Sequence, residues 1–420
     1  MIKDKYYLKF FNKLRKLINL DVMYFAKAGF YGIIQQIIGV VSGLIVSYLF
    51  GHFVSKTTYG EYNLVLSVIS LVTFFSIPGI DKALTQSISK SRDSSFIEAL
   101  NIKLKFSLLG SLALVGFGIY YLQNHSFTIA KSIFLAAVFY PSLTSFSIYS
   151  AFLTAKRKFK ALAITASISS VLFLIIIAGG IFIFSTTIGI TLAYLLALIL
   201  PAVGNYIYSL RFMIRKKSID TDLSPYGIFL TIISILPWIS GSLGNIILGT
   251  KLGPETLAIF AVADNFLISV QKNFMVFYKP VTAKLAAQTN KQHFETIKTH
   301  LFNLVSIGFA LTLFLWLITP WLISFFFPTY SEAIKYGRLL SLALLPLPLT
   351  WTLSDMVVYQ KQKKIQIFVC TIPPLLKICL YFLVIPIWKI DGLVAVFLLD
   401  RYLAPLILLP SLFMHKSIKN

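Results

Sequence analysis

Apolar residues in this chain are grouped in long runs that recur from Gly29 to Met414, with short polar segments between them. A run of about 20 apolar residues is long enough to cross a bilayer as a helix. We therefore expect an all-α, polytopic membrane protein with twelve transmembrane helices. The expected spans are 29–51, 60–81, 104–122, 131–153, 162–184, 187–210, 227–250, 256–278, 301–326, 334–359, 365–386 and 391–414. The break at 185–187 is so short that the fifth and sixth spans could instead be one helix.

The composition points to lipid as the main solvent of this chain. Its 420 residues are 57% hydrophobic and 13% charged, whereas soluble domains carry about 25% charged residues. In lipid, an open chain crosses as helices, because each helix satisfies its backbone amides within its own segment.

The sequence offers no candidate cofactor or metal site. It has no phosphate-binding Gly-x4-Gly-Lys-Ser/Thr loop, and its histidines lie outside or at the edges of the spans, without metal-ligand spacing. Cys370 and Cys379 fall on opposite faces of one helix, so they form neither a metal motif nor a disulfide. The expected loops are too short for an extramembrane catalytic domain. We therefore expect a transporter without a cofactor, not an enzyme.

The basic residues define an orientation. With both termini in the cytoplasm, 29 of the 38 Lys and Arg residues lie on the cytoplasmic side, 6 on the outer side and 3 within spans. This asymmetry follows the positive-inside rule. The net charge of +23 is therefore an orientation signal, and we expect no nucleic-acid partner.

The segment 1–28 places aromatic and aliphatic residues on one face of a helix and lysines on the other. Such a segment would lie flat on an anionic inner leaflet, in contact with membrane lipids. Anchoring is the favoured role, and a regulatory arm is the alternative. The residues 415–420 form a cytoplasmic tail.

The chain contains an internal repeat. Shifting the first span by 198 residues places Gly29 on Gly227 and Gly51 on Gly249, and two pairs of prolines recur at shifts of 205 and 204. Two halves, 29–217 and 218–414, would each hold six spans, which is an even number and makes the repeats parallel. Two such six-helix lobes enclose a central cavity, and rocking between them is a route to alternating access.

Polar groups inside the spans are the candidates for lining this cavity, because charges in a membrane cost about 2.5–3.5 kcal/mol each on insertion scales. At 100° per residue, Asp264 and Gln271 share one direction and Asn265 and Lys272 another, which together make one polar stripe. Lys377 lies on the order of 18 Å deep, and Asp400 and Arg401 lie near the same depth. The candidate substrate-binding residues are Lys272, Lys377, Arg401, Asp264, Asp400, Asn265, Gln271 and Gln35.

Structural alternatives exist for several of these residues. Lys377 and Asp400 could pair across adjacent helices and merely neutralise each other. Lys272 could extend its amine to the membrane interface. Gln35 could hydrogen-bond a neighbouring helix in place of lining the cavity.

A short motif links the first two spans: Phe50-Gly51, then Thr58-Tyr59-Gly60-Glu61-Tyr62, with an echo at Leu248-Gly249. The motif resembles the signature of polysaccharide exporters, and the chain is most similar to O-antigen and exopolysaccharide flippases (Wzx-type) of the multidrug/oligosaccharidyl-lipid/polysaccharide (MOP) exporter superfamily. The similarity covers nearly the whole chain. Lipid II flippases of the same superfamily usually have fourteen spans, so the expected twelve depart from that subgroup.

The resemblance implies two six-helix lobes around a cationic cavity in the bacterial cytoplasmic (inner) membrane. It implies a substrate, an oligosaccharide repeat unit on undecaprenyl diphosphate, which is moved from the inner to the outer leaflet. It also implies coupling to H+ or Na+, and the polysaccharide polymerase and chain-length machinery as partners. The candidate residues above match no motif of the family.

Two other classes of function were weighed. A cation-coupled multidrug exporter of the same architecture would need carboxylates in its cavity. A membrane-embedded polymerase or ligase would need a large outer loop bearing arginines, which this chain lacks.

Overall fold

The computed structural model describes residues 22–214, 220–286, 290–360 and 362–414. These residues fold almost entirely into helices, and none of them forms a strand. The predicted all-α fold is therefore confirmed. The expected amphipathic segment falls largely outside the described residues, as does the tail 415–420, although the described residues 22–28 already belong to the helix that contains Gly29.

The N-terminal half of the chain forms eight α-helices. They are α2 (Val22–Phe53), α3 (Lys56–Leu71), α4 (Gly79–Ser89), α5 (Ser95–Gln123), α6 (Phe127–Ser145), α7 (Tyr149–Ala155), α8 (Phe159–Phe184) and α9 (Thr187–Ser209), with short 3-10 turns η1 (Val72–Ser76), η2 (Phe146–Ile148) and η3 (Leu210–Phe212).

The described residues of the C-terminal half form six further helices. They are α10 (Leu223–Leu252), α11 (Pro254–Ala286), α12 (Asn290–Phe326), α13 (Ala333–Ser341), α14 (Leu347–Tyr359) and α15 (Lys363–Met414), with one 3-10 turn, η4 (Leu342–Leu344).

Two expected spans are bent. The helices α3 and α4 meet at 43°, where Ile77 has a left-handed φ of 49° and Pro78 follows. The helices α13 and α14 meet at 41°, just before Pro346. Proline has no amide proton to donate, so it favours a break at both places.

The expected fifth and sixth spans are separate helices. Ser185, with a φ of 44°, ends α8, and Thr186 caps the first turn of α9 by accepting a hydrogen bond from the Gly189 amide at 3.3 Å. A side-chain oxygen at this position satisfies one of the amides that a helix start leaves unpaired.

In the described part of the chain, eight helices are long and apolar enough to cross a membrane, or up to ten if each bent pair is one span. The protein is therefore a multi-pass membrane protein. A total of twelve remains a prediction, because it also counts α11 as a span and divides α15 at Lys389, whose φ of 50° and ψ of −129° interrupt the helix.

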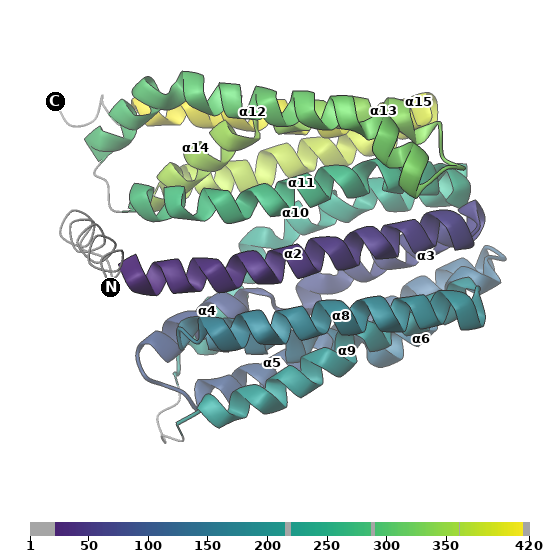
Figure 1. Cartoon of the computed structure of the whole chain (residues 1–420), viewed down its shortest axis with the longest axis horizontal. Helices are drawn as coiled ribbons and strands as arrows, with labels where there is room; N and C mark the ends of the chain where they lie inside the picture. The colour runs from purple at the N-terminus through teal and green to yellow at the C-terminus, as the bar shows by residue number, and fades with distance from the viewer. Residues whose placement is uncertain (1–21, 215–219, 287–289, 361, 415–420) are drawn as a thin grey trace, which may run out of the picture.

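The helices of each half pack mainly on one another. Figure 1 shows α4, α5, α6, α8 and α9 on one side of α2, and α10 to α15 on the other. Contacts between the halves run chiefly from α3 and α4 to α10 and α11. Outward-facing apolar side chains such as Phe302 and Val138, 80% and 76% exposed, cover the outside, as expected for a surface in lipid.

Two buried aspartates, Asp93 and Asp220, hold the two ends of the connection between the halves against the N-terminal half. Arg92 pairs with Asp220, and Lys156 Nζ lies 2.5 Å from Asp93 Oδ2. The same Asp93 oxygen accepts a hydrogen bond from the Ile214 amide at 2.9 Å. Ile214 and Asp220 are thus held against the turn between α4 and α5.

Candidate functional site

A cavity of about 670 Å³ lies between the two halves. One wall comes from α2, α3, α8 and α9, and the other from α10 and α11. Ligand pockets typically have volumes of about 300–1,000 Å³. The cavity therefore has the size of a ligand site, at the predicted position between the halves.

Amides and hydroxyls line much of this cavity. Three hydrogen bonds cross it from one half to the other: Gln36 to Asn273, Ser242 to Ser70 at 2.9 Å, and Asn265 to Ser47 at 3.4 Å. The further polar groups in the lining are Asn63, Ser67, Asn245, Asp264, Ser269 and Lys272. These groups are available to hydrogen-bond a polar ligand.

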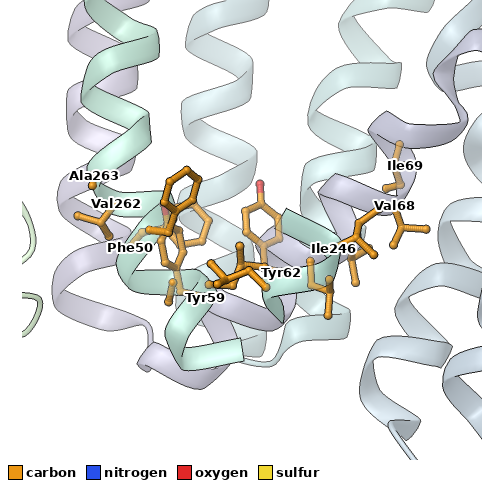
Figure 2. Packing of buried hydrophobic residues seen from close by; sticks show 14 of the residues in the cluster. Phe50, Tyr59, Tyr62, Val68, Ile69, Ile246, Val262 and Ala263 are labelled. Atoms are coloured by element: carbon orange, nitrogen blue, oxygen red, sulfur yellow. The ribbon is translucent and has the colours of Figure 1, made fainter. Parts of the chain in front are cut away.

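One end of the cavity is closed by aromatic rings. Phe50, Tyr59 and Tyr62 line it and are only 4–5% exposed, and Phe50 lies 5.1 Å and 5.2 Å from the two tyrosine rings. Figure 2 shows these three side chains packed with residues of α10 and α11. At the other end Lys272 and Ser269 are exposed, so among the described residues the cavity is accessible from that end.

Two glycines of the Phe50–Tyr62 motif allow the closed end to form. A Cβ on Gly51 would lie 1.8 Å from the Phe326 carbonyl oxygen, and a Cβ on Gly60 would lie 1.9 Å from that of Pro254. Beside them, Thr57 donates a hydrogen bond to Glu255 Oε1 at 2.7 Å. Only glycine permits the backbones of the two halves to come this close.

The polar stripe predicted on α11 is only partly in the cavity. Asp264, Asn265 and Lys272 line it, whereas Gln271 does not. Within the described residues, Asp264 Oδ1 and Gln271 Nε2 are buried without a hydrogen-bond partner. Lys272, Lys377 and Arg401 are near enough to Asp264 to favour its charged form electrostatically.

A charged cluster consists of Lys377, Asp400 and Arg401, and none of the three lines the cavity. Lys377 Nζ lies 3.0 Å from Asp400 Oδ2, which is the pairing weighed above as the structural alternative. Lys377 and Arg401 both lie over the Phe397 ring, at 5.4 Å and 5.0 Å from its centre. The structure thus separates three of the predicted residues from the cavity, and their part in substrate binding stays a prediction.

The glutamine of α2 that was predicted to line the cavity, Gln35, does not line it. Gln35 is half-buried, and its neighbour Gln36 lines the cavity instead. Adjacent residues on a helix point in directions that differ by 100°, so Gln35 and Gln36 cannot both face the cavity directly.

Several polar residues of the lining were not predicted from the sequence. Asn63, Asn245 and Asn273 are uncharged amides inside apolar helices, and they were not among the candidates. An amide in lipid is itself costly unless it finds a partner. Inspecting every in-span amide, in addition to every charge, would have found them.

The described residues contain no group of three His, Cys, Asp or Glu side chains that could hold a metal ion. Cys370 and Cys379 are both free thiols.

Comparison with known proteins gives a family and a fold. Residues 25–285 match the family described as polysaccharide biosynthesis protein. No curated protein sequence matches the chain.

Several solved structures share the fold at low identity. An inward-facing multidrug resistance MATE family transporter of the MOP superfamily is 14% identical, with a TM-score of 0.65 over 92% of this chain and 96% of that one. The lipid II flippase MurJ in an inward closed conformation is 17% identical, with a TM-score of 0.62 over 92% and 87%. A MOP-superfamily transporter from Pyrococcus furiosus is 13% identical, with a TM-score of 0.59 over 93% and 96%.

These neighbours are transporters and flippases, not enzymes, and their similarity extends over both halves of the chain. The matched family covers more than half of the sequence. The chain therefore belongs to the polysaccharide biosynthesis protein family and has the fold of a MOP-superfamily transporter.

Proposed function

We propose that this protein moves an oligosaccharide repeat unit linked to undecaprenyl diphosphate, a precursor of O-antigen or exopolysaccharide, from the inner to the outer leaflet of the bacterial cytoplasmic membrane. Membership of the polysaccharide biosynthesis family and a fold shared with a lipid II flippase support a lipid-linked sugar as the substrate.

The proposal rests on the types of side chain that line the cavity from one end to the other. Amides and hydroxyls donate to and accept from sugar hydroxyls, and aromatic rings at the closed end offer apolar faces to sugar rings. Lys272 stands at the accessible end, where a cation can form charge-assisted hydrogen bonds to phosphate oxygens. A substrate would therefore enter sugar first, with its diphosphate near Lys272 and its polyprenyl tail in lipid.

The orientation predicted from the basic residues places the accessible end of the cavity on the cytoplasmic side. The structure then corresponds to the loading state of an alternating-access cycle. Separation of α3 from α11 at the aromatic end, with approach of the halves near Lys272, would open the cavity to the outer leaflet. A gradient of H+ or Na+ would drive the cycle, and a polymerase with chain-length machinery would use the product.

Deletion of the gene in a polysaccharide-producing host tests the proposal. We expect loss of surface polysaccharide and accumulation of undecaprenyl-diphosphate-linked repeat units, both reversed by the gene on a plasmid. Intact surface polysaccharide without accumulation would contradict it.

A cation-coupled multidrug exporter is the second candidate. Asp264 supports it, because a carboxylate in the cavity lining is what a cationic drug would need. A susceptibility panel on the deletion strain separates the two functions: hypersensitivity to several cationic drugs with normal polysaccharide favours export.

A further inference from the structure

A second cavity, of about 540 Å³, lies at the end of the molecule where α3 begins. The turn between α5 and α6 and the turn between α10 and α11 form its walls. The second cavity shares no lining residue with the central cavity. Glu61 lines the second cavity and Tyr62 lines the central one, while Gly60 between them contacts the backbone of Pro254. The predicted orientation places this second cavity on the outer face.

Two polar groups in this cavity have hydrogen-bonding capacity to spare. The Tyr121 side chain is 3% exposed, and its hydroxyl has no partner in the part of the chain that the structure describes. Glu61 Oε2 accepts a hydrogen bond from Thr187 at 2.5 Å, and no described cation forms a salt bridge with this carboxylate. A buried hydroxyl without a partner is destabilising, so a ligand that pairs with it binds more tightly.

The lining selects the chemistry of the ligand. It offers a carboxylate, an amide, hydroxyls and aromatic rings, from Glu61, Asn124, Thr250, Tyr120 and Tyr121, and it includes no Lys or Arg. Glu61 would repel a diphosphate, and among the other lining residues His125 alone could carry a positive charge. A sugar hydroxyl can donate to the Glu61 carboxylate, and it can accept from the Tyr121 hydroxyl once that buried group turns toward the ligand. The C–H faces of a sugar ring can pack on the exposed Tyr120 ring.

The wall of this cavity joins the two halves of the chain. Gly249, Thr250, Gly253 and Pro254 belong to the C-terminal half, and the other lining residues to the N-terminal half. The two parts meet at the contact of Gly60 with Pro254 and at the hydrogen bond from Thr57 to Glu255. A complete binding surface therefore exists only while the aromatic end of the central cavity is closed. A ligand that binds one state alone stabilises that state.

We propose that this second cavity is a carbohydrate-binding site on the outer face, which takes the sugar portion of translocated material and stabilises the outer-closed state. The ligand class rests on the proposed function, whereas the binding itself is measured without transport.

The test uses the full chain purified in nanodiscs and, as probe, the delipidated repeat-unit oligosaccharide released from the host polysaccharide by mild acid. Calorimetry should show binding that Tyr121→Phe and Asn124→Ala each weaken about fivefold, the effect of losing one hydrogen bond. Asn245→Ala, in the central cavity, should leave the affinity within twofold. Absence of binding by the unaltered protein, or a loss caused by Asn245→Ala and not by the two outer variants, would overturn the proposal.

A second measurement addresses the outer-closed state. The Thr57→Cys/Glu255→Cys variant, once cross-linked, should bind the probe as tightly as the uncross-linked protein or more tightly, and loss of binding would overturn the coupling. If either binding experiment contradicted this proposal, the deletion strain could still accumulate lipid-linked repeat units. The binding proposal and the proposed function are therefore tested separately.

Discussion

The Gly60 Cα faces the backbone of Pro254 so closely that a Cβ would lie 1.9 Å from the Pro254 carbonyl oxygen. Gly60 belongs to α3 and Pro254 begins α11, so this contact joins the two halves of the chain at the closed end of the cavity. Ordinary contacts of a Cβ begin near 3.4 Å, and a methyl group here would therefore push the backbones apart by roughly 1.5 Å.

We expect Gly60→Ala to open the aromatic end. Alanine favours a helix over glycine by about 1 kcal/mol, so any loss of function must come from the contact and not from α3 itself. Labelling of a cysteine at position 67, which lines the cavity, by an impermeant maleimide from the outside of intact cells should rise several-fold. The background would carry Cys370→Ala and Cys379→Ala.

Gly116→Ala is the matched control, because a Cβ there meets no atom within 4 Å. Labelling at position 67 should stay at the level of the unaltered protein in this variant. Equal labelling in the Gly60 and Gly116 variants would mean that the close contact does not seal the cavity.

We expect Lys272→Gln to weaken binding of the lipid-linked substrate about tenfold, because a charge-assisted hydrogen bond contributes about 1.5–3 kcal/mol. Lys272→Arg keeps the charge and should retain most of the affinity. The measurement is binding of the purified repeat-unit lipid to protein in nanodiscs. Lys90→Gln, at an exposed lysine of the fold, serves as control, and an equal loss in both variants would argue against a specific role for Lys272.

We expect substitutions in the Lys377–Asp400 pair to change the stability of the protein. Removing one partner of a buried ion pair typically destabilises by about 3–5 kcal/mol, whereas replacing both by apolar groups is often neutral. We expect Lys377→Met to lower the Tm strongly and the double variant Lys377→Met/Asp400→Leu to restore it. If the stable double variant also transports normally, the pair is structural, and if it is stable but inactive, Lys377 binds substrate as predicted from the sequence.

The sequence predicted an all-helical membrane protein, because the length of an apolar run is set by bilayer thickness and needs no tertiary information. The total of twelve spans stays a prediction. The separation of α8 from α9, in contrast, depends on the backbone conformation of Ser185. The repeat correctly placed a cavity between the halves, at the contacts of α3 with α10 and α11.

The cavity lining was predicted less well for a physical reason. Lys377, Asp400 and Arg401 are predicted to lie deep in the membrane, but depth does not determine which neighbour a side chain faces. Lys377 reaches Asp400 and the Phe397 ring, both contributed by the last segment of α15. The motif residues Gly51 and Gly60 were recognised only as a family signature, and the backbone contacts that require them became visible in the fold.

Reversible locking of the aromatic end tests alternating access most directly. In the cysteine-free background, Thr57→Cys and Glu255→Cys would replace two side chains that lie within hydrogen-bond distance. A short, reducible bis-methanethiosulfonate reagent would join them in proteoliposomes. We predict that the cross-linked protein stops moving lipid-linked oligosaccharide to the outer leaflet and that reduction restores transport. Unchanged transport by fully cross-linked protein would show that this end of the cavity does not need to open.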